Sequence, residues 1–174
     1  SEFIALMAML AATIAFSIDA MLPALPDIGR ELSPNALNSA QLILTSFVLG
    51  MGLGTFVTGP SSDTFGRKPI MIGGAFVYCV GAICAYYAQS LEVMLAARVL
   101  QGIGAAGPRV VSMAMIRDLY SGRDMARIIS LVMLIFALVP ALAPTLGYFI
   151  IAGFGWRSIF LAFILFALIA SVWL

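Results

Sequence analysis

The sequence predicts an all-α membrane protein, a bundle of six transmembrane helices. Only 10% of the 174 residues are charged and 63% are hydrophobic, whereas soluble domains average about 25% charged residues. The hydrophobic residues fall into six runs, close to the roughly 20 residues that a helix needs to cross a bilayer. Because lipid offers no hydrogen bonds to the backbone and the runs show no strand-like alternation, helices are the structure that they predict.

The six runs fill a single domain, residues 1–174. The first contains one interior charge, Asp19, and is expected to stop at Pro23 and Pro26 because proline disfavours helix continuation. The second is expected to begin near Pro34, since proline is typical of a first helical position. The predicted helices cover about residues 3–25, 34–58, 69–88, 91–116, 126–152 and 156–174.

The later helices contain informative interruptions. The third has no charged residue, whereas the fourth carries Arg98 and Arg109 and should be kinked by Pro108. In the fifth, two prolines and Gly147 share one face, which suggests a bend or a close contact. The first and fourth helices each combine an ionisable residue with a nearby proline, a pattern that indicates an inverted repeat of two three-helix units.

Lysine and arginine in the loops predict the orientation, since cytoplasmic loops are enriched in both. The loops after the second and fourth predicted helices hold most of these residues, and the other loops hold few. The N-terminus is therefore predicted to lie in the cytoplasm. The first group is Arg67, Lys68, Arg117, Arg123 and Arg127, and the second is Arg30 and Arg157.

Composition excludes several function classes. The formal net charge of +1 predicts no nucleic-acid partner, which would need a basic surface. Histidine is absent, which removes the commonest metal ligand and the commonest general base. We therefore expect no metal, no cofactor, no catalytic residue and no enzyme activity. Cys79 and Cys84 lie in an apolar run and are interpreted as small apolar residues.

Glycine patterns in the second and fourth helices favour close helix packing. Residues 102–107 match the G-x-G-x-x-G pattern of dinucleotide sites, but such a site needs a preceding strand and a βαβ unit. Inside a membrane helix, small residues instead let two backbones approach. The same interpretation applies to the small residues at every fourth position of the second helix, Ser46, Gly50, Gly54 and Thr58.

One face of the fourth predicted helix is polar. An arginine inside a membrane costs at least about 2.5 kcal/mol, so this face is expected to look into protein or water. Two alternatives stay open: Arg109 could extend toward the inner surface, and Arg98 could serve a purely structural ion pair. The face consists of Arg98, Gln101, Ala105, Arg109 and Ser112.

The segment between the second and third predicted helices, residues 59–68, combines glycines, an acid and two bases. From the residues alone it is a tight turn at a cytoplasmic helix end, and a topology anchor is one interpretation. The string also resembles G-x3-D-[RK]-x-G-R-[RK], the loop signature of the major facilitator superfamily, with Thr64 in place of the usual base. The matching residues are Gly59, Asp63, Gly66, Arg67 and Lys68.

Other strings extend this resemblance along the chain. Residues 98–104 resemble the superfamily's R-x-x-Q-G-x-G motif of helix 4, and residues 143–147 resemble a degraded antiporter motif of helix 5. The segments 18–26, 116–120 and 155–160 look similar to the Bcr/CflA drug-resistance branch.

The resemblance implies half of a major facilitator fold, the N-terminal six helices of twelve, arranged as a 3+3 inverted repeat. It implies proton-coupled efflux of small amphipathic drugs across the bacterial cytoplasmic (inner) membrane. The implied partners are the lipid bilayer, a drug, protons and a second six-helix half, which is either a C-terminal half or a second copy. A non-transporting or homodimerising six-helix scaffold remains the alternative.

Two ionic features carry the expected mechanism. At the cytoplasmic gate, Asp63 is expected to pair with Arg67, close to Arg117. Within the membrane, Asp19 is the candidate coupling carboxylate, at a depth of about 12 Å against about 9 Å for Arg98. A low dielectric disfavours a charged carboxylate, so Asp19 is expected to exchange a proton in a pair with Arg98 that is looser than bidentate, or bridged by water or Gln101. Arg109 completes the expected proton and substrate site.

Overall fold

The computed structural model describes residues 2–32 and 41–173, and all regular structure in those residues is helical. The elements are α1 (Glu2–Asp19), the 3-10 turn η1 (Leu22–Ala24), α2 (Leu25–Leu32), α3 (Leu42–Phe65), α4 (Arg67–Tyr86), α5 (Leu91–Leu119), α6 (Gly122–Phe154) and α7 (Ser158–Trp173). Counting Glu2–Glu31 as one segment, five helices are long and apolar enough to cross a membrane, and Ser158–Trp173 is a shorter apolar helix. The predicted fold class is confirmed.

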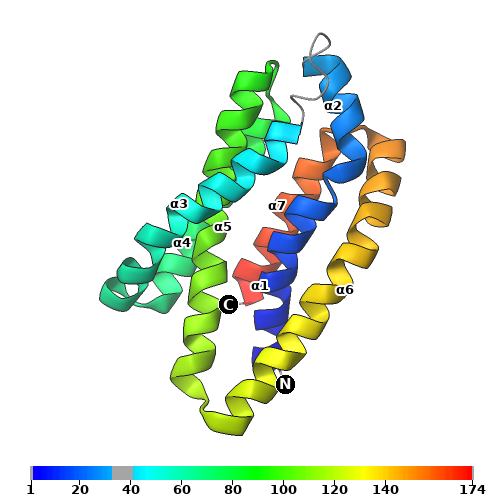
Figure 1. The fold of residues 1–174 in the computed structure, drawn as a ribbon. Helices are drawn as coiled ribbons and strands as arrows, with labels where there is room; N and C mark the ends of the chain where they lie inside the picture. The colour runs from blue at the N-terminus through cyan, green and yellow to red at the C-terminus, as the bar shows by residue number, and fades with distance from the viewer. Residues whose placement is uncertain (1, 33–40, 174) are drawn as a thin grey trace.

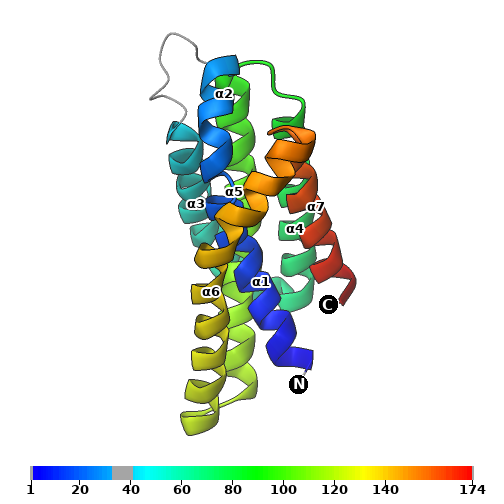
Figure 2. The ribbon, with the colours of Figure 1, turned by 90° about the vertical axis from the view of Figure 1, so that its right-hand side faces the viewer.

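The helices form two triplets that are consecutive in the sequence: the first is α1 with α2, α3 and α4, and the second is α5, α6 and α7. In space the triplets exchange their first helices, so α5 lies with α3 and α4, and α1 lies with α6 and α7 (Figures 1 and 2). Helix α5 packs against α3 and α4, and in the same way α1 packs against α6 and α7, while α4 contacts α7. Exchanging the two triplets leaves this set of contacts unchanged, as an inverted repeat requires.

The first predicted helix end was wrong. Helix α1 ends earlier, at Asp19, and the two prolines do not end the helical segment. It continues through η1 into α2, which ends at Leu32. Pro23 lies in the first turn of η1 and Pro26 in the first turn of α2, where the missing N–H has no helical partner to lose. The predicted start near Pro34 lies outside the described residues.

The predicted turn over residues 59–68 is much shorter than expected. Helix α3 continues through Pro60 to Phe65, α4 begins at Arg67, and Gly66 alone separates them. Proline is tolerated inside transmembrane helices because neighbouring groups satisfy the freed backbone. Gly66 has φ 99° and ψ 165°, a conformation open mainly to glycine.

Close backbone contacts explain the glycine patterns. A Cβ on Gly50 would lie 2.1 Å from the Val99 carbonyl oxygen, and one on Gly102 would lie 2.1 Å from that of Phe47. These contacts join α3 to α5, so the glycines serve helix packing. On α6, a Cβ on Gly147 would lie 2.5 Å from the Ala20 carbonyl oxygen, which confirms a close contact on that face.

Candidate functional site

Arg98 on α5 is buried where this helix meets α1 and α3, with 0% of its surface exposed. Its guanidinium donates to Gln101 Oε1 at 2.7 Å, to the Ser17 carbonyl oxygen at 3.1 Å and to the Ile43 carbonyl oxygen at 3.5 Å. It also lies 4.5 Å from the centre of the Phe47 ring. A buried charge needs such partners, and here they fasten α5 to both α1 and α3.

Two hydroxyls complete this buried polar cluster of Ser17, Tyr78, Arg98 and Gln101. Ser17 Oγ donates to the Thr13 carbonyl oxygen at 2.7 Å, and the Ser17 and Tyr78 hydroxyls share a short hydrogen bond that links α1 to α4. Gln101 Nε2 has no hydrogen-bond partner in the described part of the chain. The Gln101 side chain therefore accepts from Arg98 through Oε1, while its two Nε2 hydrogens remain free to donate.

Asp19 is not part of this cluster. It is the last residue of α1 and half-buried, and its carboxylate forms no ion pair or hydrogen bond with any described residue. Arg98 binds the backbone of Ser17, two residues earlier, instead of the Asp19 carboxylate. The structure therefore brings Arg98 to within two residues of Asp19 on α1, without an ion pair or hydrogen bond between the two side chains.

The expected cytoplasmic gate residues meet at the start of α4. Arg67 lies 2.8 Å from Asp63 Oδ1 and 3.0 Å from Asp118 Oδ2, and also donates to Ser62 Oγ at 2.7 Å. The pair of Asp63 with Arg67 is present as expected. On α5, however, the partner is Asp118, while Arg117 forms no ion pair within the residues described. We name Asp63, Arg67 and Asp118 the inner ion-pair cluster, after the predicted orientation.

Lys68 and Gly59 contribute no charge to the inner ion-pair cluster, although the Gly59 carbonyl oxygen accepts a hydrogen bond at 2.9 Å from the Ser62 hydroxyl that Arg67 contacts. Among the described residues Lys68 has no ion pair, and a Cβ on Gly59 would meet nothing within 4 Å. The motif thus contributes through Asp63, Gly66 and Arg67, with Asp118 as a partner that the motif does not contain.

A second cluster at the opposite end of the bundle was not predicted. Arg157 lies 3.1 Å from Glu31 Oε1 and donates to the carbonyl oxygens of Tyr86 at 2.6 Å and Ala88 at 2.8 Å. Trp156 donates its indole N–H to the same Glu31 carboxylate, and the Arg157 guanidinium lies 4.3 Å from the indole centre. This outer cluster joins α2, the end of α4 and the start of α7.

The two clusters are related by the repeat. Gly66, with φ 99° and ψ 165°, precedes Arg67, and Gly155, with φ 89° and ψ 167°, comes two residues before Arg157. Each arginine pairs with an acid near the end of the first membrane segment of the other triplet: Arg67 with Asp118 and Arg157 with Glu31. The inner and outer clusters are therefore counterparts at opposite ends of the bundle.

A groove of about 380 Å³ lies between α1, α3, α5 and α6. Apolar side chains line most of it, and Arg109 reaches it from α5, where its side chain is exposed. The predicted polar face of α5 is thus divided, with Arg98 and Gln101 inside the bundle and Arg109 in the groove. Other lining residues are Ile18, Met51, Ser112, Met113, Met133 and Phe136.

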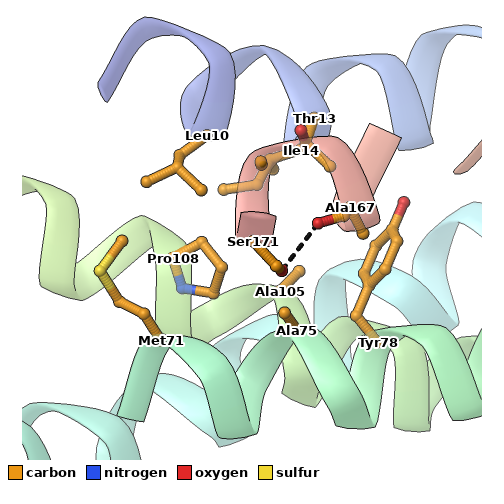
Figure 3. Close-up of a pocket in the computed structure, with 11 residues that line it drawn as sticks. Leu10, Thr13, Ile14, Met71, Ala75, Tyr78, Ala105, Pro108, Ala167 and Ser171 are labelled. Atoms are coloured by element: carbon orange, nitrogen blue, oxygen red, sulfur yellow. Dashed lines mark hydrogen bonds between the residues drawn. The ribbon is translucent and has the colours of Figure 1, made fainter. Parts of the chain in front are cut away.

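A smaller cavity of about 30 Å³ lies where α1, α4, α5 and α7 meet (Figure 3). Its two small hydroxyls are already engaged, Ser171 with the Ala167 carbonyl oxygen at 2.8 Å and Thr13 with that of Met9 at 2.9 Å. A site of this size with no free polar group suits packing rather than ligand recognition.

Comparison with known proteins decides the family. Residues 5–174 match the family model described as Major Facilitator Superfamily. The chain belongs to the Major Facilitator Superfamily. Membership agrees with the Arg67 motif, the Arg98 motif and the repeat-related packing described above.

Two curated relatives within the superfamily are drug-resistance proteins, which confirms the branch that the sequence resembles. The chain is 36% identical over 90% of its length to the chloramphenicol resistance protein of Pseudomonas aeruginosa. It is 35% identical over 97% of its length to the bicyclomycin resistance protein homolog of Haemophilus influenzae. It spans 37% and 42% of these two relatives.

Solved structures of the superfamily share the fold. The proton:xylose symporter XylE bound to 6-bromo-6-deoxy-D-glucose has a TM-score of 0.85 at 16% identity, over 98% of this chain and 43% of that one. A D-xylose–proton symporter structure gives 0.86 at 16% identity, over 99% and 47%. At this identity the likeness shows the fold alone.

Proposed function

We propose that this chain is the N-terminal six-helix half of a proton-coupled multidrug efflux antiporter in the bacterial cytoplasmic membrane, with its N-terminus inside. The observation that carries the proposal is Asp19. It is a half-buried carboxylate without an ion-pair partner in the described residues, and the adjacent Ile18 lines the groove. The names of the drug-resistance relatives support efflux as the direction of transport.

Proton coupling needs a carboxylate that can exist in both protonation states. A permanent bridge to Arg98 would keep Asp19 ionised, but Arg98 is occupied by Gln101 and two backbone carbonyls. Burial disfavours the charged form of the Asp19 carboxylate. Asp19 itself does not line the groove in this conformation, so the proposal requires that the rocking of the two halves opens a path for the proton. Arg98 acts as a positioning residue in this mechanism, because it holds the end of α1 that carries Asp19.

A second six-helix half is the proposed partner across the groove. Met133 and Phe136 of α6 line the groove and are exposed, and Leu49 and Leu53 of α3 are exposed as well. The partner is a C-terminal half of the same chain or a second copy, and rocking of the two halves would expose Asp19 to each side in turn.

The test compares two acids of the first membrane segment in the complete transporter. Asp19→Asn should abolish proton-driven efflux while binding of a neutral drug survives. Asp27→Asn should retain efflux, because Asp27 pairs with Arg30 at the outer end, far from the groove. Efflux by Asp19→Asn with a normal pH dependence would place the coupling carboxylate elsewhere.

A further inference from the structure

Among the described residues that line the groove, Arg109 is the charged one. The lining contains no carboxylate, and Arg109 forms no ion pair with any residue that the structure describes. Its own carbonyl oxygen accepts a hydrogen bond from Ser112 Oγ at 3.1 Å. The guanidinium therefore faces the groove with its donors uncommitted.

The position of Arg109 along α5 keeps this charge in the groove. Ten residues separate it from Leu119, the inner end of α5, which is about 15 Å at 1.5 Å per residue. That distance is longer than an arginine side chain, so the guanidinium stays beside the groove that it lines and does not reach the end of α5. A cation held at this depth needs an anionic or strongly accepting partner.

The rest of the lining suits an adaptable apolar molecule. Met51, Met113 and Met133 surround the groove together with Phe136. Unbranched thioethers adjust to different shapes, which is why methionine is common on promiscuous binding surfaces. The volume of about 380 Å³ also falls among small-molecule pockets, which are mostly apolar with a few polar groups that fix orientation.

From these features we propose that the groove selects amphipathic anions, with the apolar body against the methionines and the anionic group on Arg109. Lipophilic cations are disfavoured because they would meet a like charge and find no carboxylate in the lining. The inference rests on the proposed function only in treating the groove as the drug path. It adds a substrate class and a residue that determines specificity.

The experiment uses the complete transporter, purified in mild detergent, and two probes with one body. One is pyrene with a butyrate chain, and the other is the same pyrene with a trimethylammonium chain. We expect the butyrate probe to bind at least about tenfold more tightly, the range of a hydrogen bond to a charged group. Arg109→Gln should remove this preference, Arg109→Lys should keep most of it, and Arg123→Gln, an exposed cation on α6, should leave it unchanged.

Two results would overturn the proposal. One is equal binding of the two probes by the unmodified protein. The other is an equal loss of binding of both probes in the Arg109→Gln variant together with a lower melting temperature. That result would make Arg109 a structural partner of the second half. If the charge preference follows Arg109 but no proton-driven efflux is found, the binding inference stands and the proposed function fails. If efflux is found without a charge preference, the proposed function stands and the binding inference fails.

Discussion

Two adjacent glycines on α4 offer a test of how tightly the repeat units pack. A Cβ on Gly74 would lie 2.7 Å from the Gly104 carbonyl oxygen, whereas one on Gly73 would meet nothing within 4 Å. Ordinary contact begins near 3.4 Å, so α4 and α5 would have to separate by several tenths of an ångström. Overpacking of this kind costs about 1–3 kcal/mol, against a gain of about 1 kcal/mol from replacing glycine by alanine within a helix.

Gly73→Ala should therefore stabilise the protein slightly, and Gly74→Ala should destabilise it by up to about 2 kcal/mol. The half-buried Cys79 and the exposed Cys84 supply the assay, because a thiol-reactive fluorophore reports unfolding as the detergent-solubilised protein is heated. The increase in fluorescence as Cys79 becomes accessible reports unfolding, and the reaction of the already exposed Cys84 gives the baseline fluorescence. Equal shifts of the melting temperature in the two variants would refute the packing argument.

Two further predictions concern orientation and gating. Gln89 and Ser121 are both exposed. With both native cysteines replaced, a cysteine at Gln89 should react with an impermeant reagent added outside intact cells, and a cysteine at Ser121 should not. The reverse labelling pattern would invert the proposed topology. Asp63→Asn and Asp118→Asn should each slow turnover of the complete transporter with nearly normal expression, because an exposed ion pair contributes about 0–1 kcal/mol and so biases conformation more than folding. The transporter with Arg117→Gln should keep a normal turnover rate. If this variant is slowed to the same degree, Arg117 takes part in the gate.

The helical fold class could be predicted because the bilayer dictates both the length and the hydropathy of a membrane helix. The family could be predicted from the motifs in residues 59–68 and 98–104. The break after Asp19 could not. A proline that disrupts a helix interior is acceptable in the first turn of the next helix, and the sequence alone does not say which of these applies to Pro23 and Pro26.

The site was predicted in part, for reasons of geometry. Counting residues gives depth along a helix but not the direction in which a side chain points. It therefore predicts Asp19 and Arg98 as neighbours, whereas in the structure Arg98 binds the Ser17 carbonyl oxygen. Arg117 and Asp118 are adjacent in sequence but point about 100° apart on a helix, and packing selects Asp118. The hydroxyl of Tyr78 was missed because a single tyrosine barely changes the hydropathy of an apolar run.

The inner and outer clusters have a consequence for how this half can move. Arg67 joins the two triplets at one membrane face and Arg157 joins them at the other, so neither triplet can tilt against the other without breaking a pair at one end. Between these ends, the contact of Gly50 with Val99 leaves no room for α3 and α5 to slide. The six helices should therefore move as one rigid body, with the change of shape concentrated at the surface that meets the second half.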